Sequence, residues 1–169
     1  LHYNSNDRLN RIVFKGNWKL SKREGYGTLK FENGSKFKGT CRNDMANGPG
    51  SFFYHNREKY TGDFEDDRAS GYGEFLYLNG DVYRGNWKDN VKSGYGEIFH
   101  KEGEIISYKG NFDGNQRNGY GELAWRLGSS YKGNFVGGQI EGFGEFRFCA
   151  LVGCGKQNLF LKTPGAVYT

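Results

Sequence analysis

One short pattern occurs six times in this chain, and it constrains the fold more than any other feature. Tyr83–Gly96 shows it most fully, with an aromatic residue, a glycine two places on, a second aromatic two places later, a polar turn, and Gly-Tyr-Gly. The opening aromatics recur at intervals of 23, 23, 23, 25 and 23 residues, at Phe14, Phe37, Tyr60, Tyr83, Tyr108 and Tyr131. Because three residue classes keep their spacing over six periods, we interpret the chain as a repeat protein.

Each repeat predicts two strands joined by a tight turn. Side chains alternate along a strand, so the two aromatics and the glycine of the first strand should share one face. The turn position holds residues that favour turns, namely Ser21, Asp44, Asp67, Asn90, Asn115 and Gly138. The second strand begins at the paired glycines, and we expect both to face the aromatic side and leave room for a neighbouring ring. The apolar residues that follow continue this face as a core ladder.

The pattern Tyr-x-Gly-x-Trp, followed after six residues by Gly-x-Gly, resembles the MORN repeat (membrane occupation and recognition nexus). The resemblance covers residues 10–148, most of the chain. It implies an all-β fold, an elongated single-layer twisted antiparallel sheet of six consecutive MORN-type β-hairpins. It also implies a scaffold or binding role, since family members mostly act in this way and some associate with membranes or the cytoskeleton.

The two ends of the chain depart from the repeat. Residues 1–9 carry no repeat signature and are interpreted as a lead-in. Residues 149–169 are predicted to be an irregular C-terminal extension. One interpretation places an insertion at 150–164 and the start of a seventh repeat at Tyr168, because Gly165–Thr169 resembles Gly80–Arg84. The alternative is a terminal cap, which repeat arrays need for closure.

Composition narrows the class of partner. The net charge of +5 is spread along the chain and argues only weakly for an anionic partner. Basic residues alternate with acids and form no stripe, which argues against nucleic acid. No apolar run approaches the ~18–20 residues of a membrane helix. Three cysteines (Cys41, Cys149 and Cys154) lack pairing or ligand spacing, which favours free thiols in a reducing, cytoplasmic setting.

The sequence shows no catalytic constellation, so we predict no enzyme activity, no cofactor and no metal site. The segment Gly153–Lys156 is only superficially like a phosphate loop, because Ala150 replaces its first glycine and Gln157 replaces its Ser/Thr. His100 falls on the core ladder and is expected to pack at its rim instead of binding a metal.

A row of aromatic residues is the first candidate site. The residue between the paired glycines should face away from the core ladder, and five of these six positions are aromatic, with Pro49 interrupting the row. The predicted partner-binding residues are Tyr26, Tyr72, Tyr95, Tyr120 and Phe143. Aromatics on a solvated face are typical of an interaction surface. The alternative is that the twisted sheet buries these rings against itself.

A charged row is the second candidate site. The residue after the opening aromatic is basic in five repeats, giving Lys15, Lys38, Arg84, Lys109 and Lys132 as candidate phospholipid-binding residues. On the same face, the residue after Gly-x-Gly is Glu74, Glu97, Glu122 or Glu145 in the last four repeats. Cross-strand ion pairing is therefore favoured over an anionic lipid surface. A lipid surface, if present, should lie in the first two repeats, which lack the glutamate.

Three functions remain open at this point. The first is a non-catalytic scaffold or adaptor that binds an extended segment or helix of another protein along the repeats, and the family resemblance implies a cytoskeletal or ciliary assembly as its setting. The second is a peripheral membrane module that binds anionic phospholipids. The third is the targeting segment of a larger enzyme, left open because the sequence starts at Leu1. Exposed terminal strands would also allow end-to-end self-association.

Overall fold

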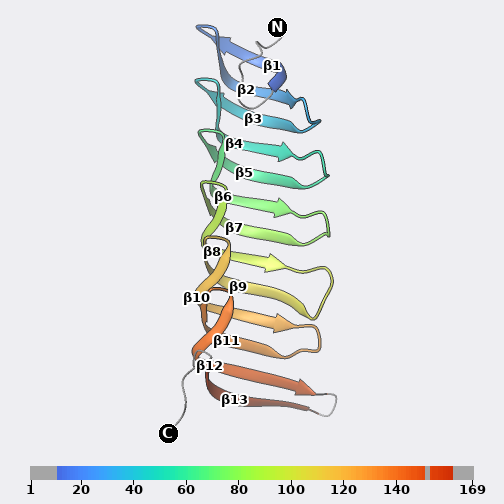
Figure 1. The fold of residues 1–169 in the computed structure, drawn as a ribbon, viewed down its shortest axis with the longest axis vertical. Coiled ribbons are helices and arrows are strands. Elements are labelled where there is room, and N and C mark those ends of the chain that lie inside the picture. The colour runs from blue at the N-terminus through green and yellow to red at the C-terminus, as the bar shows by residue number, and fades with distance from the viewer. Residues whose placement is uncertain (1–10, 151–152, 162–169) are drawn as a thin grey trace. The chain divides into compact units, whose positions relative to one another are not determined.

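The computed structural model describes residues 11–150 and 153–161. Consecutive strands are neighbours throughout, in one antiparallel sheet of thirteen strands ordered β1 to β13 (Figure 1). These described residues form strands and turns and no helix. They divide into two compact units, one up to Gly80 together with Asn86–Val91, the other Asp81–Gly85 together with the residues from Lys92 onward. The predicted all-β sheet of consecutive hairpins is confirmed.

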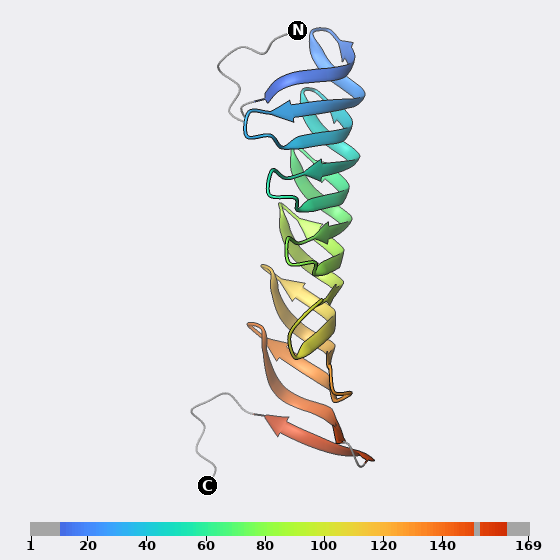
Figure 2. The same ribbon diagram turned by 90° about the vertical axis from the view of Figure 1, so that its right-hand side faces the viewer.

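Three hairpins build the first unit. Their strands are β1 (Arg11–Lys19), β2 (Lys22–Phe31), β3 (Lys36–Arg42), β4 (Met45–Phe53), β5 (Lys59–Glu65) and β6 (Arg68–Leu76). The strands are bent, as the side view shows (Figure 2). Phe37, Tyr60 and Phe64 of the core ladder are buried in this unit.

The second unit repeats this arrangement. Its strands are β8 (Val91–Phe99), β9 (Ile105–Asp113), β10 (Gln116–Trp125), β11 (Ser130–Val136), β12 (Gln139–Ala150) and β13 (Gly153–Leu161), while β7 (Val82–Lys88) contributes residues to both units. Tyr83, Tyr108 and Tyr131 are almost fully buried. The Tyr108 hydroxyl donates a hydrogen bond to the Asn111 carbonyl at 2.9 Å, so the ring keeps its polar end satisfied.

The hairpin turns adopt the conformation that their residues predict. In the six turns within the repeats both central residues have positive φ, at Leu20/Ser21, Asn43/Asp44, Asp66/Asp67, Asp89/Asn90, Gly114/Asn115 and Gly137/Gly138. Two successive positive φ values define a type I′ turn, whose twist matches that of the flanking strands. Asn, Asp and Gly dominate these positions because they tolerate the left-handed region best.

The paired glycines serve two different purposes, which corrects the expectation that both face the aromatic side. The second glycine is covered by a ring, since a Cβ on Gly121 would lie 2.5 Å from the Cε2 and hydroxyl oxygen of Tyr108. The first glycine is needed for its backbone. Gly119 has a φ of 77°, and a Cβ there would meet only the Asn111 side chain, at 3.7 Å. Alternation fails at this point because the strand pairing shifts register next to the first glycine.

The predicted irregular C-terminal extension is wrong for residues 153–161. They form strand β13, which pairs with β12 from Gly142 opposite Leu161 to Ala150 opposite Gly153. Without β13, the backbone groups along this edge of β12 would have no strand partner. The pairing sets positions 149 and 154 opposite each other. Cys149 is disulfide-bonded, so the expectation of free cysteines is wrong for Cys149, whereas the buried Cys41 is a thiol. Tyr168 lies outside the described residues.

Candidate functional site

The five predicted partner-binding aromatics are exposed. Tyr26 and Tyr72 lie on the first unit, on either side of the repeat with Pro49, and Tyr95, Tyr120 and Phe143 lie on consecutive repeats of the second unit. Their exposed fractions run from 52% to 71%. Burial of these rings by sheet twist, the alternative raised above, is therefore wrong. Their part in binding a partner stays a prediction.

Polar residues separate these rings along the sheet. Tyr95 pairs with Asn111 across the strands, and Tyr120 pairs with Asn134. In the first unit, Tyr26 pairs with Thr40. Rings at alternate strands stand ~10 Å apart, since neighbouring strands are ~4.8 Å apart. Each unit thus presents flat apolar rings with amide or hydroxyl groups between them, on the face opposite the core ladder.

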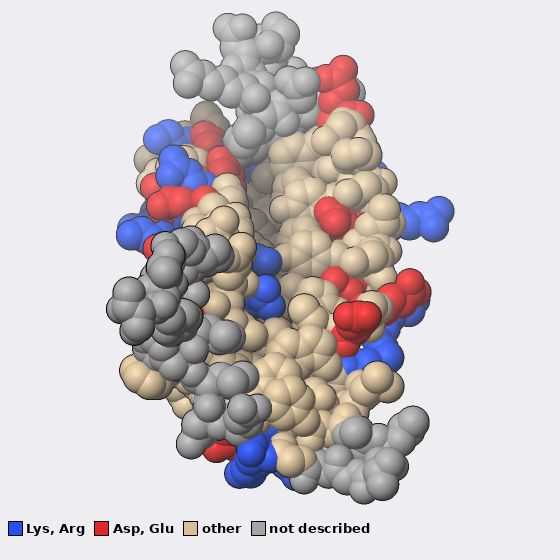
Figure 3. Space-filling model, turned by 60° about the horizontal axis from the view of Figure 1, so that its bottom comes forward, with Lys and Arg blue, Asp and Glu red and all other residues tan. Residues whose placement is uncertain are grey.

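In the second unit the charged row is neutralised by pairing. Lys109 lies across from both Glu97 and Glu122, and Lys132 across from Glu122 and Glu145. Lys132 forms an ion pair with Glu122. The guanidinium carbon of the candidate Arg84 lies 6.0 Å from the centre of the Phe99 ring. Positive and negative side chains are interspersed on the face seen in Figure 3.

The first unit differs in this respect. Lys15 pairs with Thr28, and Lys38 lies between Thr28 and Ser51. On the adjacent positions Lys30 pairs with Lys36, a like-charge pair directly across two strands. The basic residues of the first two repeats are therefore not matched by acids on their own row, as the sequence indicated.

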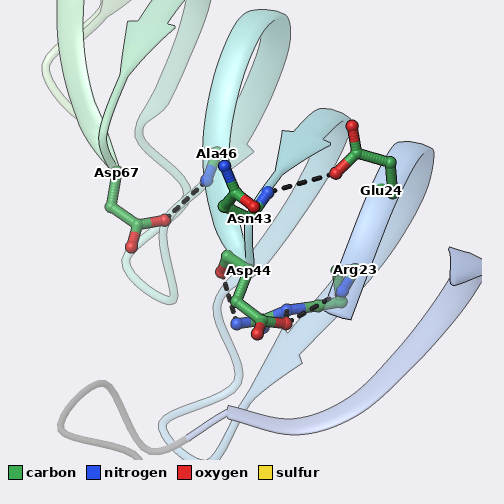
Figure 4. Close-up of polar contacts among 6 residues, drawn as sticks. All are labelled: Arg23, Glu24, Asn43, Asp44, Ala46 and Asp67. Carbon is green, nitrogen blue, oxygen red and sulfur yellow. Dashed lines mark hydrogen bonds and ion pairs between the residues drawn. The ribbon is translucent and has the colours of Figure 1, made fainter. Parts of the chain in front are cut away.

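A second set of contacts, which the sequence reasoning missed, ties each turn to the hairpin before it. Asp44 accepts hydrogen bonds from the Arg23 backbone N–H at 2.9 Å and from its Nε at 3.1 Å (Figure 4). Asp67 accepts one from the Ala46 backbone N–H at 2.8 Å (Figure 4). The equivalent bonds run from Ala69 to Asn90 and from Lys92 to Asn115. The recurrence of Asp or Asn at one turn position is the sequence signal for these bonds, and turn preference alone also accounts for that recurrence.

The side chain of the residue that donates to each turn lies next to the rings of the core ladder, and its identity differs between the two units. In the second unit it is a long cation. The Lys92 Nζ lies 5.3 Å from the Tyr83 ring centre and 5.5 Å from that of Phe112. Arg117 lies likewise over Tyr108 and Phe135, at 5.7 and 5.6 Å. Burial lowers the pKa of Lys92 and that of Arg117.

The same burial acts on the tyrosines beneath. It raises the pKa of Tyr108 to about 12, while the Arg117 guanidinium opposes the rise. Burial likewise raises the pKa of Tyr60 and of Tyr131. These hydroxyls are therefore neutral hydrogen-bond donors throughout the physiological range.

In the first unit, alanine replaces the cation in two successive repeats, at Ala46 and Ala69. An open pocket of about 320 Å³ lies on the core face there. It is lined by Leu29, Phe31, Asn33, Phe37, Ala46, Phe52, Tyr54, Tyr60, Phe64, Asp67, Ala69 and Asn90. In the second unit two pockets of about 410 Å³ lie on the same face, one next to Lys92 and Arg117 and one next to Trp125 and Phe148. None of the five exposed aromatics lines these pockets.

The remaining predictions concern metals and membranes. His100 is half-buried, and its Nδ1 is hydrogen-bonded to the Asp81 carboxylate at 2.7 Å, a contact that the sequence did not predict. Over the described residues, no cluster of three or more His, Cys, Asp or Glu side chains has the arrangement of a metal site. The described part of the chain also contains no helix long and apolar enough to cross a membrane.

The MORN repeat family model matches residues 14–36, 60–82, 83–99, 108–129 and 131–149. The chain belongs to the MORN-repeat family. The family model leaves residues 37–59 unmatched, where Cys41 and Pro49 replace two repeat aromatics, yet β3 and β4 form the same MORN hairpin there. MORN-repeat proteins have scaffold and binding roles and are typically non-catalytic.

Other comparisons add little. Among solved structures, the chain is similar to the SAS-4 (dCPAP) TCP domain of Drosophila melanogaster in complex with a proline-rich motif of Ana2 (dSTIL). The identity is 13%, the match covers 79% of this chain and 83% of that chain, and the TM-score is 0.30. A likeness of that size carries no argument about partners. No curated protein matches the sequence.

Proposed function

We propose that this MORN-repeat chain is a non-catalytic scaffold that binds another protein through its exposed aromatic row. The supporting observation is the exposure of Tyr26, Tyr72, Tyr95, Tyr120 and Phe143 at one repeat position. Large rings offer contact area at low conformational-entropy cost, which is why they are enriched at interfaces. The second unit presents three rings on consecutive repeats, so it is the stronger part of the surface.

The partner that suits this surface is an extended segment or a helix that crosses several strands. It would place apolar side chains against the rings and polar groups against Asn111 and Asn134, which lie between them. A cytoplasmic setting in a cytoskeletal or ciliary assembly belongs to this proposal and is supported by family membership.

The test is capture of partners from a cell lysate by the purified chain and by a variant with Tyr72, Tyr95 and Tyr120 changed to serine. A matched control changes Leu20, Leu78 and Leu127 to serine, since these side chains are equally or more exposed but lie in turns. The scaffold proposal expects the parent and the control to capture the same protein and the folded tyrosine variant to lose it. Equal capture by all three would overturn it.

A second candidate function is binding of anionic phospholipids by the first unit. It is favoured by the row of Lys15 and Lys38, which face Thr28 and Ser51 and no glutamate. Juxtaposed lysines are attracted to anionic lipid by ~1 kcal/mol each, and salt screens this attraction.

Sedimentation with phosphatidylserine vesicles tests this second function. Lys15→Ala/Lys38→Ala should reduce binding at low salt, while Lys109→Ala/Lys132→Ala, whose lysines lie across from glutamates, should not. Binding that survives high salt or is indifferent to both pairs would argue against a lipid surface.

A further inference from the structure

Four equivalent ring pairs lie along the core face of the two units. Each consists of the opening aromatic of one repeat and the second aromatic of the next, and in each the rings meet edge to face. The centroid distances are 5.0 Å for Phe37/Phe64, 5.3 Å for Tyr60/Trp87, 5.1 Å for Tyr83/Phe112 and 5.0 Å for Tyr108/Phe135. The interplanar angles lie between 80° and 88°. The backbone therefore builds the same aromatic surface four times.

The chain covers two of these surfaces with its own cations. Lys92 lies over one pair and Arg117 over the next, with centroid distances between 5.3 and 5.7 Å. A cation within ~6 Å of a ring centre is attracted by the negative face of the ring. In the second unit, the paired rings therefore bind the charged side chain of a lysine or an arginine.

At the other two pairs, alanine stands at the position that holds the cation in the second unit. Ala46 and Ala69 occupy the positions that correspond to Lys92 and Arg117, and the pocket of about 320 Å³ lies beside them. This volume is at the lower end of ligand pockets, which range over ~300–1,000 Å³. Phe37 and Phe64, which correspond to the rings beneath Lys92, line this pocket.

The charge of the pocket also suits a cation. Asp67 lines it, and the hydrogen bond from the Ala46 N–H at 2.8 Å fixes the position of its carboxylate. In the preceding hairpin the equivalent carboxylate, Asp44, forms an ion pair with the buried Arg23 at 3.1 Å. Asp67 and Ala46 occupy the positions that correspond to Asp44 and Arg23 of that pair.

We propose that the pocket beside Ala46 and Ala69 binds the side chain of a lysine or arginine from a partner protein. The aliphatic stem would pack on Phe37 and Phe64, and the charged head would meet the Asp67 carboxylate. The partner side chain takes the place that Lys92 and Arg117 occupy in the second unit. The site lies on the core face, opposite the exposed aromatic row, and does not depend on that row.

The experiment titrates n-propylguanidinium chloride, which mimics an arginine head, into the ¹⁵N-labelled chain and follows the backbone amides of Ala46 and Ala69. Saturable shifts with a Kd on the order of millimolar are expected for so small a ligand. The neutral n-propylurea has nearly the same shape and should bind at least ~10-fold more weakly. Equal binding of the two compounds, or no saturable shift with the guanidinium, overturns the proposal.

Two variants locate the site. Ala46→Arg introduces an arginine side chain of the chain itself into the pocket and should abolish the ligand-induced shifts at Ala69. Ala124→Arg on β10 is the control and should leave these shifts unchanged. Asp67→Asn keeps the turn and the hydrogen-bonding oxygen but removes the charge, and should weaken guanidinium binding ~10-fold with no effect on n-propylurea. Unchanged guanidinium binding in Asp67→Asn, or in a folded Ala46→Arg, would overturn the assignment of the site.

Discussion

Replacing Gly121 by alanine would put a methyl group into the space of the Tyr108 ring. The new Cβ would lie 2.5 Å from the ring Cε2 and hydroxyl oxygen and 2.7 Å from Cζ. The ring cannot turn away freely, because it is fully buried and its hydroxyl is bonded to the Asn111 carbonyl. Overpacking costs ~1–3 kcal/mol and loss of the hydrogen bond a further ~0.5–1.5 kcal/mol. We expect Gly121→Ala to lower local stability by ~2–4 kcal/mol.

Hydrogen exchange of the β9 and β10 amides is the suitable assay, because the stability of a repeat array is a sum of local terms. A loss of ~2–4 kcal/mol corresponds to exchange faster by roughly 30- to 1,000-fold. Gly103→Ala is the control. Gly103 has a φ of 90°, but no atom lies within 4 Å of a Cβ placed there. The control therefore measures the cost of backbone strain without a steric clash, ~1–2 kcal/mol.

A double-mutant cycle isolates the contact with the ring. In the Tyr108→Ala background the methyl has room, and alanine in a strand should be neutral or stabilising by up to ~1 kcal/mol relative to glycine. The explanation fails if Gly121→Ala costs the same with and without the ring, or costs no more than Gly103→Ala.

Three further predictions concern the second unit. The pKa of Tyr108 rises from 10.0 to about 12 on folding, so its protonation contributes ~3 kcal/mol to the free energy of unfolding below pH 10, and this contribution is lost as the pH rises to about 12. The free energy of unfolding measured with urea above pH 10 should therefore fall less steeply with pH in Tyr108→Phe than in the parent. Asn115→Ala loses both the hydrogen bond from Lys92 and a residue suited to a φ of 71°, a cost of ~1–3 kcal/mol by hydrogen exchange, whereas Asn115→Gly should recover the conformational part. Lys132→Gln should leave the thermal midpoint unchanged, because the Lys132–Glu122 pair is exposed, and a clear drop in that midpoint would show that the pair matters more than its exposure indicates.

The periodicity made the fold and the exposed face predictable, because both follow from local rules that act within one repeat. A glycine beside a recurring aromatic predicts a ring packed on bare backbone, and Gly121 beneath Tyr108 confirms it. Strict alternation placed Tyr95 and Tyr120 on the solvated side, and they are exposed. The same rule failed for the first glycine of the pair, where a shift in register turns the residue to the other face.

The rest depended on contacts that a single repeat does not contain. The bond from Ala46 to Asp67 joins residues 21 positions apart and becomes visible only when two hairpins are stacked. Strand β13 lacks the repeat signature, and its pairing is fixed by the edge of β12 and not by a pattern of its own. The pocket beside Ala46 and Ala69 depends on packing between repeats in the same way, as does the position of Lys92 and Arg117 over the equivalent rings.

Positions that build a repeat protein cannot also distinguish one repeat from another. Every repeat needs the opening aromatic packed on the second glycine of the pair. This contact stabilises the fold, and because it is the same in all repeats it cannot make one repeat bind a different partner from another. The residue that contacts the next turn is different, because at Ala46, Ala69 and Lys92 the backbone N–H makes the structural bond and the side chain can vary. Four repeats use this freedom in two ways, with Lys92 and Arg117 lying over rings of the core face and with Ala46 and Ala69 at the equivalent positions, where they line a pocket. Selectivity for a partner along such a sheet should therefore be encoded at this one position, repeat by repeat.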